Sequence, residues 1–232
     1  MQLEQLTTPS GTVLQGPLLI TPQAFGDDRG WFYESWNQRK FDDAVGESVL
    51  FSQDNHSRSI QGVLRGLHYQ LTPEPQAKLV RATVGAIYDV AVDIRRDSPT
   101  FGAWVGAELS AENRSQLWIP EGFAHGFLTL SSVAEVQYKA RGFWNKSCER
   151  AIVWNDPDLA IAGRSSICRA LRSVCRARMQ KHQASSRQPA QEMCFRESSA
   201  HRSWRTAGTG PDRLRPPGTR AGKHQPSGAR PR

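Results

Sequence analysis

The chain has 232 residues and a formal net charge of +8, but this charge is an average over two unlike segments. Residues 1–162 carry 14 Lys and Arg against 19 Asp and Glu, with six of the seven tryptophans and all four tyrosines, a composition typical of a globular domain. Residues 163–232 carry 16 basic and three acidic residues but only four Leu, Ile or Val, so we expect a disordered basic tail. The net charge therefore does not indicate a nucleic-acid-binding domain.

The single cysteine of residues 1–162 and the lack of long apolar segments argue against two further classes, disulfide-rich secreted proteins and membrane proteins. Cys148 is the one cysteine of residues 1–162, so no disulfide framework is expected there. The first residues lack the basic and apolar regions of a signal peptide, and no apolar run approaches the ~20 residues of a membrane span. We therefore expect a cytoplasmic protein without a membrane partner.

Short strands separated by turn signals make up most of residues 1–162. In chain order they cover residues 11–20, 31–36, two strands within 63–80, two within 82–96, and then 101–109, 116–130, 134–140 and 150–154. Residues 25–30 predict a turn, and residues 37–44 predict a short helix with Gly46 just beyond its end. About ten strands with little helical periodicity predict an all-β sandwich or barrel.

Two polar segments precede the centre of the chain. Arg29 and Glu34 belong to a turn and the strand after it, where the simplest interpretation is a solvated ion pair of little energetic value. The segment 51–58 is too polar for a core strand, and alternation places Gln53 and Asn55 on one face. Amides in such a place are usually edge residues, but they also suit a site that recognises carbonyls and hydroxyls.

The stretch 63–80 carries polar groups of four kinds, Arg65, His68, Gln70 and Lys78. If the strand alternates without a bulge, His68 shares a face with Gln70, and Arg65 lies on the opposite face. A lone histidine in such a strand is more often a hydrogen-bonded core residue than a catalyst, so its neighbours decide the interpretation.

The following strands add two carboxylates and a second histidine. Asp89 and Asp93 share one face of an apolar strand, where an unpaired carboxylate is costly, and Lys78 and an arginine are the expected partners. The turn Pro120-x-Gly-x-x-His125 resembles the second signature of the cupin jelly rolls.

The first signature of metal-binding cupins, with two histidines and a glutamate close together, is absent. Tyr69 and Gln70 follow His68, and His68 and His125 alone are too few for a metal site, so we expect no metal ion. A neutral histidine accepts a proton, Tyr138 donates one and Lys78 stabilises an oxyanion. These groups suit enolisation, and arginines suit a phosphate on the substrate.

A series of short motifs follows in order along residues 1–162. They are Phe25-x-Asp-x-Arg29-Gly, Gln53-Asp54-Asn55, Arg65-Gly-Leu-His68-Tyr-Gln70, Lys78-Leu-Val, Asp89-Val-Ala-Val-Asp93, Ser98-Pro-Thr-Phe-Gly, Leu117-Trp-Ile-Pro-x-Gly-Phe-Ala-His125 and Tyr138-Lys. This order resembles the dTDP-4-dehydrorhamnose 3,5-epimerase family. The resemblance implies a homodimeric, cupin-like jelly roll that inverts C3 and C5 of dTDP-4-dehydro-6-deoxy-D-glucose, without a cofactor, on the route to dTDP-L-rhamnose.

The resemblance also implies a role for each matching residue. It makes His68 the base and Tyr138 the acid, with Lys78 on the enolate oxygen and Asp89 as the partner of Lys78. Trp144 stands where the family has a tyrosine that stacks on the thymine base, and its ring can do the same. The positions implied to bind the nucleotide or the sugar are Phe25, Arg29, Glu34, Gln53, Asp54, Asn55, Arg65, Gln70, His125, Trp144 and Glu149.

The resemblance ends after residue 162. The family continues with Trp-Pro and then Ser-x-Lys-Asp, whose Asp hydrogen-bonds the catalytic histidine, and neither motif occurs in residues 163–232. The loss of one base near codon 162 accounts for the absence of both motifs. Ala162-Gly163-Arg164 encoded as GCT-GGC-CGN contains, two bases on, the triplets TGG-CCG, which encode Trp-Pro. Ala177-Arg178-Met179 encoded as GCA-AGG-ATG contains, in that same frame, AAG-GAT, which encodes Lys-Asp. We interpret the tail as a frameshift product and expect weak or absent activity.

Three alternatives remain open. The chain could act at C3 only or C5 only, or bind a sugar nucleotide without catalysis. Binding of nucleic acid through the tail is the third, but Phe195 and Trp204 are its only aromatic residues, so base stacking is unsupported. We expect at most non-specific, salt-sensitive adhesion of the basic tail to polyanions.

Overall fold

A computed structural model of the chain describes residues 1–161, and the predictions for residues 163–232 lie outside that range. Within it the elements are β1 (Gln2–Thr7), β2 (Val13–Thr21), β3 (Ala24–Asp27), β4 (Gly30–Tyr33), α1 (Gln38–Val45), β5 (Gln53–Ile60), β6 (Leu64–Gln70), β7 (Lys78–Val84), β8 (Ala86–Asp93), β9 (Trp104–Ser110), β10 (Gln116–Ile119), β11 (Phe123–Thr129), β12 (Val133–Ala140) and β13 (Glu149–Ala151). The prediction of an all-β fold with one short helix is confirmed.

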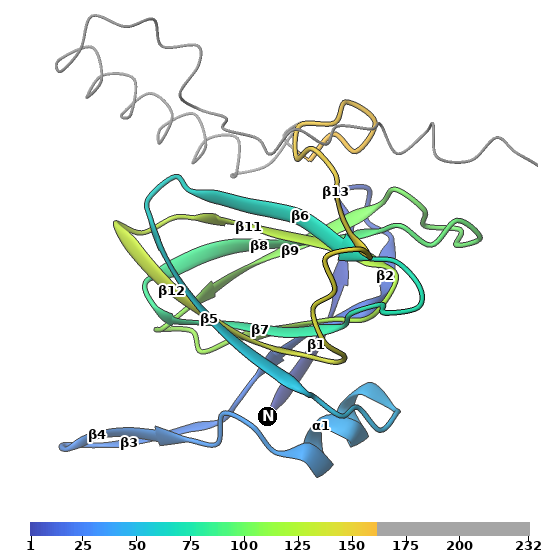
Figure 1. Cartoon of the computed structure of the whole chain (residues 1–232). Coiled ribbons are helices and arrows are strands. Elements are labelled where there is room, and N and C mark those ends of the chain that lie inside the picture. Colours follow the sequence, from blue (N-terminus) through green and yellow to red (C-terminus); the bar gives the residue numbers. More distant parts are fainter. Residues whose placement is uncertain (162–232) are drawn as a thin grey trace, which may run out of the picture. The chain divides into compact units, whose positions relative to one another are not determined.

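Two antiparallel sheets form the body of the fold (Figure 1). The larger has the order β1-β2-β10-β7-β12-β5, and the smaller has the order β13-β6-β11-β8-β9. From β5 to β8 and again from β9 to β13, strands that follow one another in the chain lie in different sheets, which is the crossing pattern of a jelly roll. The interpretation of residues 51–58 as too polar for a core strand agrees with the position of β5 at the edge of the larger sheet.

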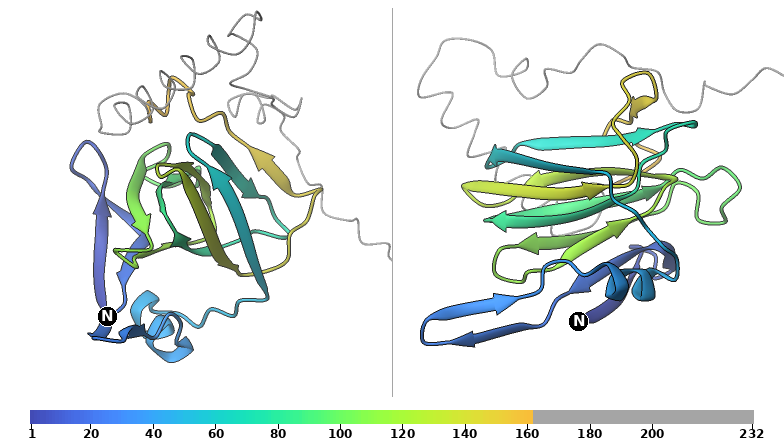
Figure 2. Two further views of the ribbon diagram at one scale, coloured as in Figure 1. Left: turned by 90° about the vertical axis from the view of Figure 1, so that its left-hand side faces the viewer. Right: turned by 60° about the horizontal axis from the view of Figure 1, so that its bottom comes forward.

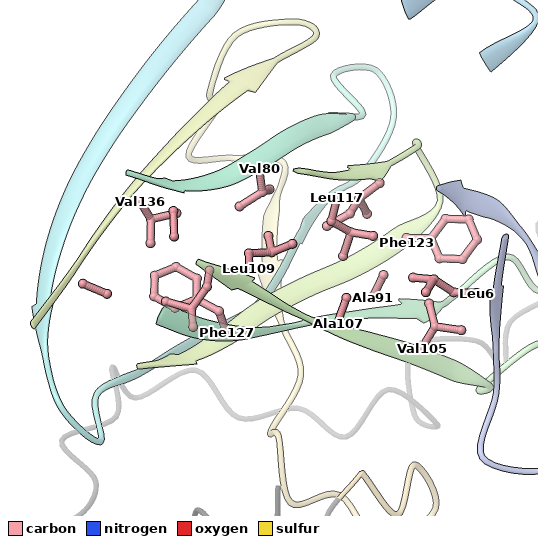
Figure 3. Close-up of a cluster of buried hydrophobic side chains, with 14 of the residues drawn as sticks. Leu6, Val80, Ala91, Val105, Ala107, Leu109, Leu117, Phe123, Phe127 and Val136 are labelled. Atoms are coloured by element: carbon pink, nitrogen blue, oxygen red, sulfur yellow. The ribbon is translucent and has the colours of Figure 1, made fainter. Parts of the chain in front are cut away.

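The main hydrophobic core lies between the two sheets (Figure 3). Val80 and Val136 come from the larger sheet, and Ile87, Val105 and Phe127 come from the smaller one. Successive side chains of a strand point to opposite faces. We call the side of each sheet that carries these core residues the inner face, and the opposite side the outer face.

A second apolar cluster covers the outer face of the larger sheet. Phe41 of α1 packs there with Leu79 and Trp118, which alternate with core residues along β7 and β10. Gly46 ends the helix as predicted, with φ of 77°. Asn37 lies just before the helix rather than inside it, and its side chain accepts a hydrogen bond from the backbone N–H of Lys40 at 3.1 Å.

The prediction for residues 25–36 was partly wrong. Residues 24–27 form a strand rather than a turn, and its partner β4 ends at Tyr33 instead of residue 36. The turn is tight because Asp27 accepts the backbone N–H of Arg29 at 2.9 Å and Gly30 adopts φ of 136°. The resulting hairpin extends away from both sheets (Figure 2).

Strand β1 was also missed. Its side chains are exposed except for Leu6, so an edge position, rather than a pattern of alternating burial, explains the strand.

A β-bulge in β6 corrects the predicted faces of the central stretch. His68 lies opposite His125 and Arg65 lies opposite Phe127, so a step of three residues in β6 matches a step of two in β11. Arg65 and His68 therefore project from the same face, contrary to simple alternation. Gly66 lies inside the bulge with φ of 111°, and a Cβ there would lie 2.6 Å from the Cα of Gly126.

Gly66→Ala should therefore destabilise the fold by about 3 kcal/mol, because the methyl group meets backbone atoms in a region that disfavours side chains. Gly102→Ala is the matched control, since Gly102 has φ of 80° but nothing within 4 Å of its hypothetical Cβ. Urea denaturation of both variants separates backbone strain from steric contact. An equal loss of stability in the two variants would mean that the contact between the added methyl group and the backbone of β11 contributes nothing to the loss in Gly66→Ala.

Candidate active site

The smaller sheet contributes one group of the predicted site residues to the inner face. Asp89 stands between the core residues Ile87 and Ala91 on β8, and His125 stands between Phe123 and Phe127 on β11. His68 and Arg65 lie opposite His125 and Phe127 in the ladder, so they project from the same side. These side chains therefore face the larger sheet.

The larger sheet contributes a second group from the facing side. Lys78 lies two residues before the core residue Val80, and Tyr138 lies two residues beyond Val136 and packs against the main core. Asn55 of β5 is directly opposite Tyr138. Segments separated by about 70 residues of sequence thus bring His68 and Tyr138 to opposite walls of one interior.

His68 is held in a state that favours accepting a proton. Its side chain is 49% exposed. Burial lowers the pKa of His68; the carboxylate of Glu149 opposes this shift, while Lys78 and His125 lower the pKa of His68 further. A histidine with a pKa below 6.5 is neutral at pH 7, as a general base must be.

Lys78 and Tyr138 lie side by side on the facing wall. The Lys78 Nζ is 5.9 Å from the centroid of the Tyr138 ring. Burial lowers the pKa of Lys78, although Asp89 and Glu149 raise it. Burial raises the pKa of Tyr138, so its phenol stays protonated at pH 7 and can donate a proton.

The hydrogen-bond partner of Asp89 differs from the expected one. Asp89 is fully buried, and its Oδ1 lies 2.7 Å from the Nε2 of His125 rather than bonding Lys78. Because a carboxylate only accepts, Nε2 of His125 carries the proton. The other oxygen, Oδ2, is buried without a hydrogen-bond partner among residues 1–161, and Asp89 acts on Lys78 only through its charge.

Asp93 has the arginine partner that the sequence predicted. Its Oδ2 lies 2.8 Å from Arg95 Nη2 and accepts from Ser98 and Thr100 at 2.6 and 2.7 Å. Burial raises the pKa of Asp93, but these hydrogen bonds outweigh it and lower the value to about 2. Asp93 is thus a structural carboxylate, separate from the pair formed by Asp89 and His125.

Polar contacts connect the amide residues to the segment around Trp144. Gln53 donates to Asn55 at 2.9 Å and accepts the backbone N–H of Trp144 at 3.0 Å. Gln70 accepts the backbone N–H of Asn145 at 2.7 Å. Trp144 as a whole residue is 53% exposed, which leaves its side chain accessible to a flat partner.

Four of the predicted binding residues do not join the inner-face group. Asp54 lies opposite Lys139 and forms an ion pair with it at 3.0 Å on the outer face. Phe25 and Arg29 lie on the β3–β4 hairpin and Glu34 just beyond it. Arg29 pairs with Asp27, and Glu34 with Lys40 at 2.7 Å, so the predicted surface ion pairs exist with other partners.

An outer-face cavity of about 260 Å³ was not foreseen. Arg81 and Gln137, which bond each other at 2.8 Å, line it together with Trp36 and Lys139. Alternation could have placed Arg81 and Gln137 on one side of the sheet, but nothing in the sequence indicated that Trp36 would cover them.

Residues 1–161 lack two further features. This part of the chain contains no group of three or more His, Cys, Asp or Glu side chains that could hold a metal ion. It contains no helix with the length and apolar composition of a bilayer span.

The family model for dTDP-4-dehydrorhamnose 3,5-epimerase matches residues 11–184 of the chain. The chain belongs to the dTDP-4-dehydrorhamnose 3,5-epimerase family. Its match extends beyond residue 162, where composition predicted a boundary.

Other members of this family resemble the chain over most of their own length. The dTDP-4-dehydrorhamnose 3,5-epimerase of Pseudomonas aeruginosa is 63% identical over 144 residues, which are 62% of this chain and 79% of that protein. A dTDP-4-dehydrorhamnose 3-epimerase of Streptomyces niveus is 37% identical over 64% of this chain and 72% of that protein.

Solved structures of family members have the same fold. The crystal structure of dTDP-6-deoxy-D-glucose-3,5-epimerase from Legionella pneumophila in complex with dTDP-4-keto-L-rhamnose superposes with a TM-score of 0.64. It is 46% identical and covers 69% of this chain and 82% of that one. The predicted cupin-like jelly roll is thereby confirmed.

Proposed function

We propose that the chain inverts C3 and C5 of dTDP-4-dehydro-6-deoxy-D-glucose in the cytoplasm, giving dTDP-4-dehydro-L-rhamnose for dTDP-L-rhamnose synthesis. The observation that carries this proposal is the position of His68 and Tyr138 on facing sheets, with Lys78 beside Tyr138. The C4 ketone acidifies the protons on C3 and C5 alike. One base and one acid on opposite sides of the ring can therefore serve both carbons.

Inversion requires a proton to leave one face of the ring and another to arrive on the opposite face. Neutral His68 removes the proton on carbon α to the ketone, which leaves an enolate. The phenol of Tyr138 then delivers a proton from the other wall. The pKa shifts support these roles, because burial lowers the pKa of His68 and raises that of Tyr138.

Lys78 stabilises the negative oxygen of the enolate. Burial lowers its pKa, yet the charge of Asp89 opposes this and favours the ammonium form. Lys78→Ala should therefore lower kcat by ~10²–10³, the usual loss when one oxyanion donor is removed. Lys139→Ala is the control, since Lys139 lies on the outer face beside Asp54. A loss confined to KM in the Lys78 variant would instead assign Lys78 to binding.

The nucleotide half of the substrate would lie between Trp144 and the arginines. The exposed ring of Trp144 offers a stacking face for thymine, and Arg65 offers a charged donor for the diphosphate. Arg29 and Phe25 lie on a hairpin that extends away from the sheets of its own chain. We propose that in a homodimer this hairpin reaches the site of the second copy.

Deuterium uptake from solvent tests the function directly. Incubation of dTDP-4-dehydro-6-deoxy-D-glucose with the chain in D₂O should place deuterium at C3 and C5, read by NMR and mass spectrometry. Label at one carbon only would assign a mono-epimerase, and label at C3 only would match the 3-epimerase activity named for the Streptomyces niveus relative. Binding of dTDP without any label, even in a chain with the family C-terminal motif restored, would leave a non-catalytic sugar-nucleotide-binding protein.

A further inference from the structure

Glu149 reaches His68 from a third strand. β13 pairs with β6 so that Ala151 lies opposite His68 and Glu149 lies opposite Gln70. Residues two apart on a strand share a face, so Glu149 projects on the same side as His68. Its Oε1 is 3.8 Å from the Nδ1 of His68, and within residues 1–161 no other carboxylate oxygen lies within 4.0 Å of the ring nitrogens.

The backbone around Glu149 fixes this placement. Leu67 and Ile152 exchange two hydrogen bonds, at 2.9 and 3.2 Å, on one side of His68. On the other side, the N–H of Leu71 donates to the carbonyl of Cys148 at 2.9 Å. The ladder is therefore closed at both ends of the short strand, and the carboxylate is presented to His68 by the fold rather than by a mobile loop.

The charge of Glu149 acts on three groups of the site. Burial lowers the pKa of His68, and Glu149 is the group that raises it, against Lys78 from β7 and His125 from β11. Burial also lowers the pKa of Lys78, which Glu149 raises. Burial raises the pKa of Tyr138, and Glu149 adds to that rise.

We propose that Glu149 is a positioning residue for the base: its carboxylate accepts the Nδ1–H of His68 and leaves the Nε2 lone pair to take the substrate proton. A carboxylate in this place fixes the tautomer and the orientation of an imidazole and stabilises the imidazolium that forms. The separation of 3.8 Å exceeds a hydrogen bond, and such contacts tighten when the substrate binds. This inference rests on the proposed role of His68 as the base.

Glu149→Gln tests the proposal because it keeps the shape of the side chain and removes its charge. NMR titration of the His68 ring in the free protein, assigned with a His68→Asn spectrum, should show a lower pKa than in the unchanged chain. Because the base works when neutral, the rising limb of the kcat/KM profile should move to lower pH. The plateau kcat should fall by ~10–100-fold, less than the ~10⁴ of a buried Asp–His pair, because both side chains are partly exposed.

Glu149→Asp and Glu135→Gln complete the test. The first keeps the charge at a greater distance and should restore part of the pKa and of kcat. The second removes the carboxylate of another His–Glu pair, in which Glu135 lies 3.1 Å from His56. It should change neither the pKa of His68 nor kcat.

Two results separate this proposal from the proposed function. An unchanged pKa of His68 in Glu149→Gln, with weaker binding of dTDP-sugar, would make Glu149 a ligand contact only and overturn the proposal. A lowered pKa without deuterium uptake in any variant, including variants made in a chain with the family C-terminal motif restored, would support the contact between Glu149 and His68 and refute the epimerase function instead.

Discussion

Restoring the reading frame from codon 162 is expected to raise turnover by as much as ~10⁴, the loss seen when an imidazole base lacks its aspartate, because Glu149 lies 3.8 Å from the Nδ1 of His68 and replaces that aspartate only in part. The restored frame would supply the Ser-x-Lys-Asp motif that the family resemblance requires and residues 163–232 lack. The measurement is NADPH oxidation coupled through the downstream reductase, with deuterium uptake as a direct check on proton abstraction.

The nucleotide sequence provides the first control for this prediction. Codons for Ala162, Gly163 and Arg164 that cannot contain TGG-CCG would rule out the frameshift. A chain shortened to residues 1–161 is the second control, because it separates the loss of the motif from inhibition by the basic tail. Near-normal turnover in the unchanged 232-residue chain would refute the expected impairment.

His68→Asn and Tyr138→Phe are expected to fail in different ways. His68→Asn should lower deuterium uptake at both carbons by ~10²–10⁴, because proton abstraction loses its base. Tyr138→Phe should keep much of the uptake but stop inversion, since His68 can return a proton only to the face from which it removed one. NMR of the recovered sugar reports label and configuration together, preferably in the frame-repaired chain.

Matched residues on the outer faces serve as controls for both substitutions. His56→Asn removes a histidine that pairs with Glu135, and Tyr88→Phe removes a half-buried tyrosine on the other face of β8. Neither should alter uptake or inversion. If Tyr138→Phe abolished uptake as completely as His68→Asn, the two groups would not act on opposite sides of the ring.

Much of the site could be predicted because strand alternation is a local property. The two-residue period of β5 correctly put Gln53 and Asn55 on one face, and that of β8 did the same for Asp89 and Asp93. These inferences need no knowledge of which strands pair.

The features that were missed depend on pairing between distant strands. The bulge that brings Arg65 to the face of His68 arises from the contact of β6 with β11, although a glycine inside a strand is a known signal for such a bulge. The partner of Asp89 was wrong for the same reason: His125 is its neighbour only because β8 and β11 are adjacent. Asp54 was assigned to the site from its motif, although its side chain alternates away from Asn55.

The division of the reactive groups between two sheets links the main core to the selectivity of the reaction. Val136 lies two residues from Tyr138, and Phe127 lies two residues from His125, so apolar side chains set the spacing of the two walls. A one-methylene change in this apolar layer would shift the sugar ring of the substrate relative to the imidazole of His68 and the phenol of Tyr138, without altering any polar residue. Regioselectivity between the two carbons could therefore drift during evolution through apolar substitutions alone.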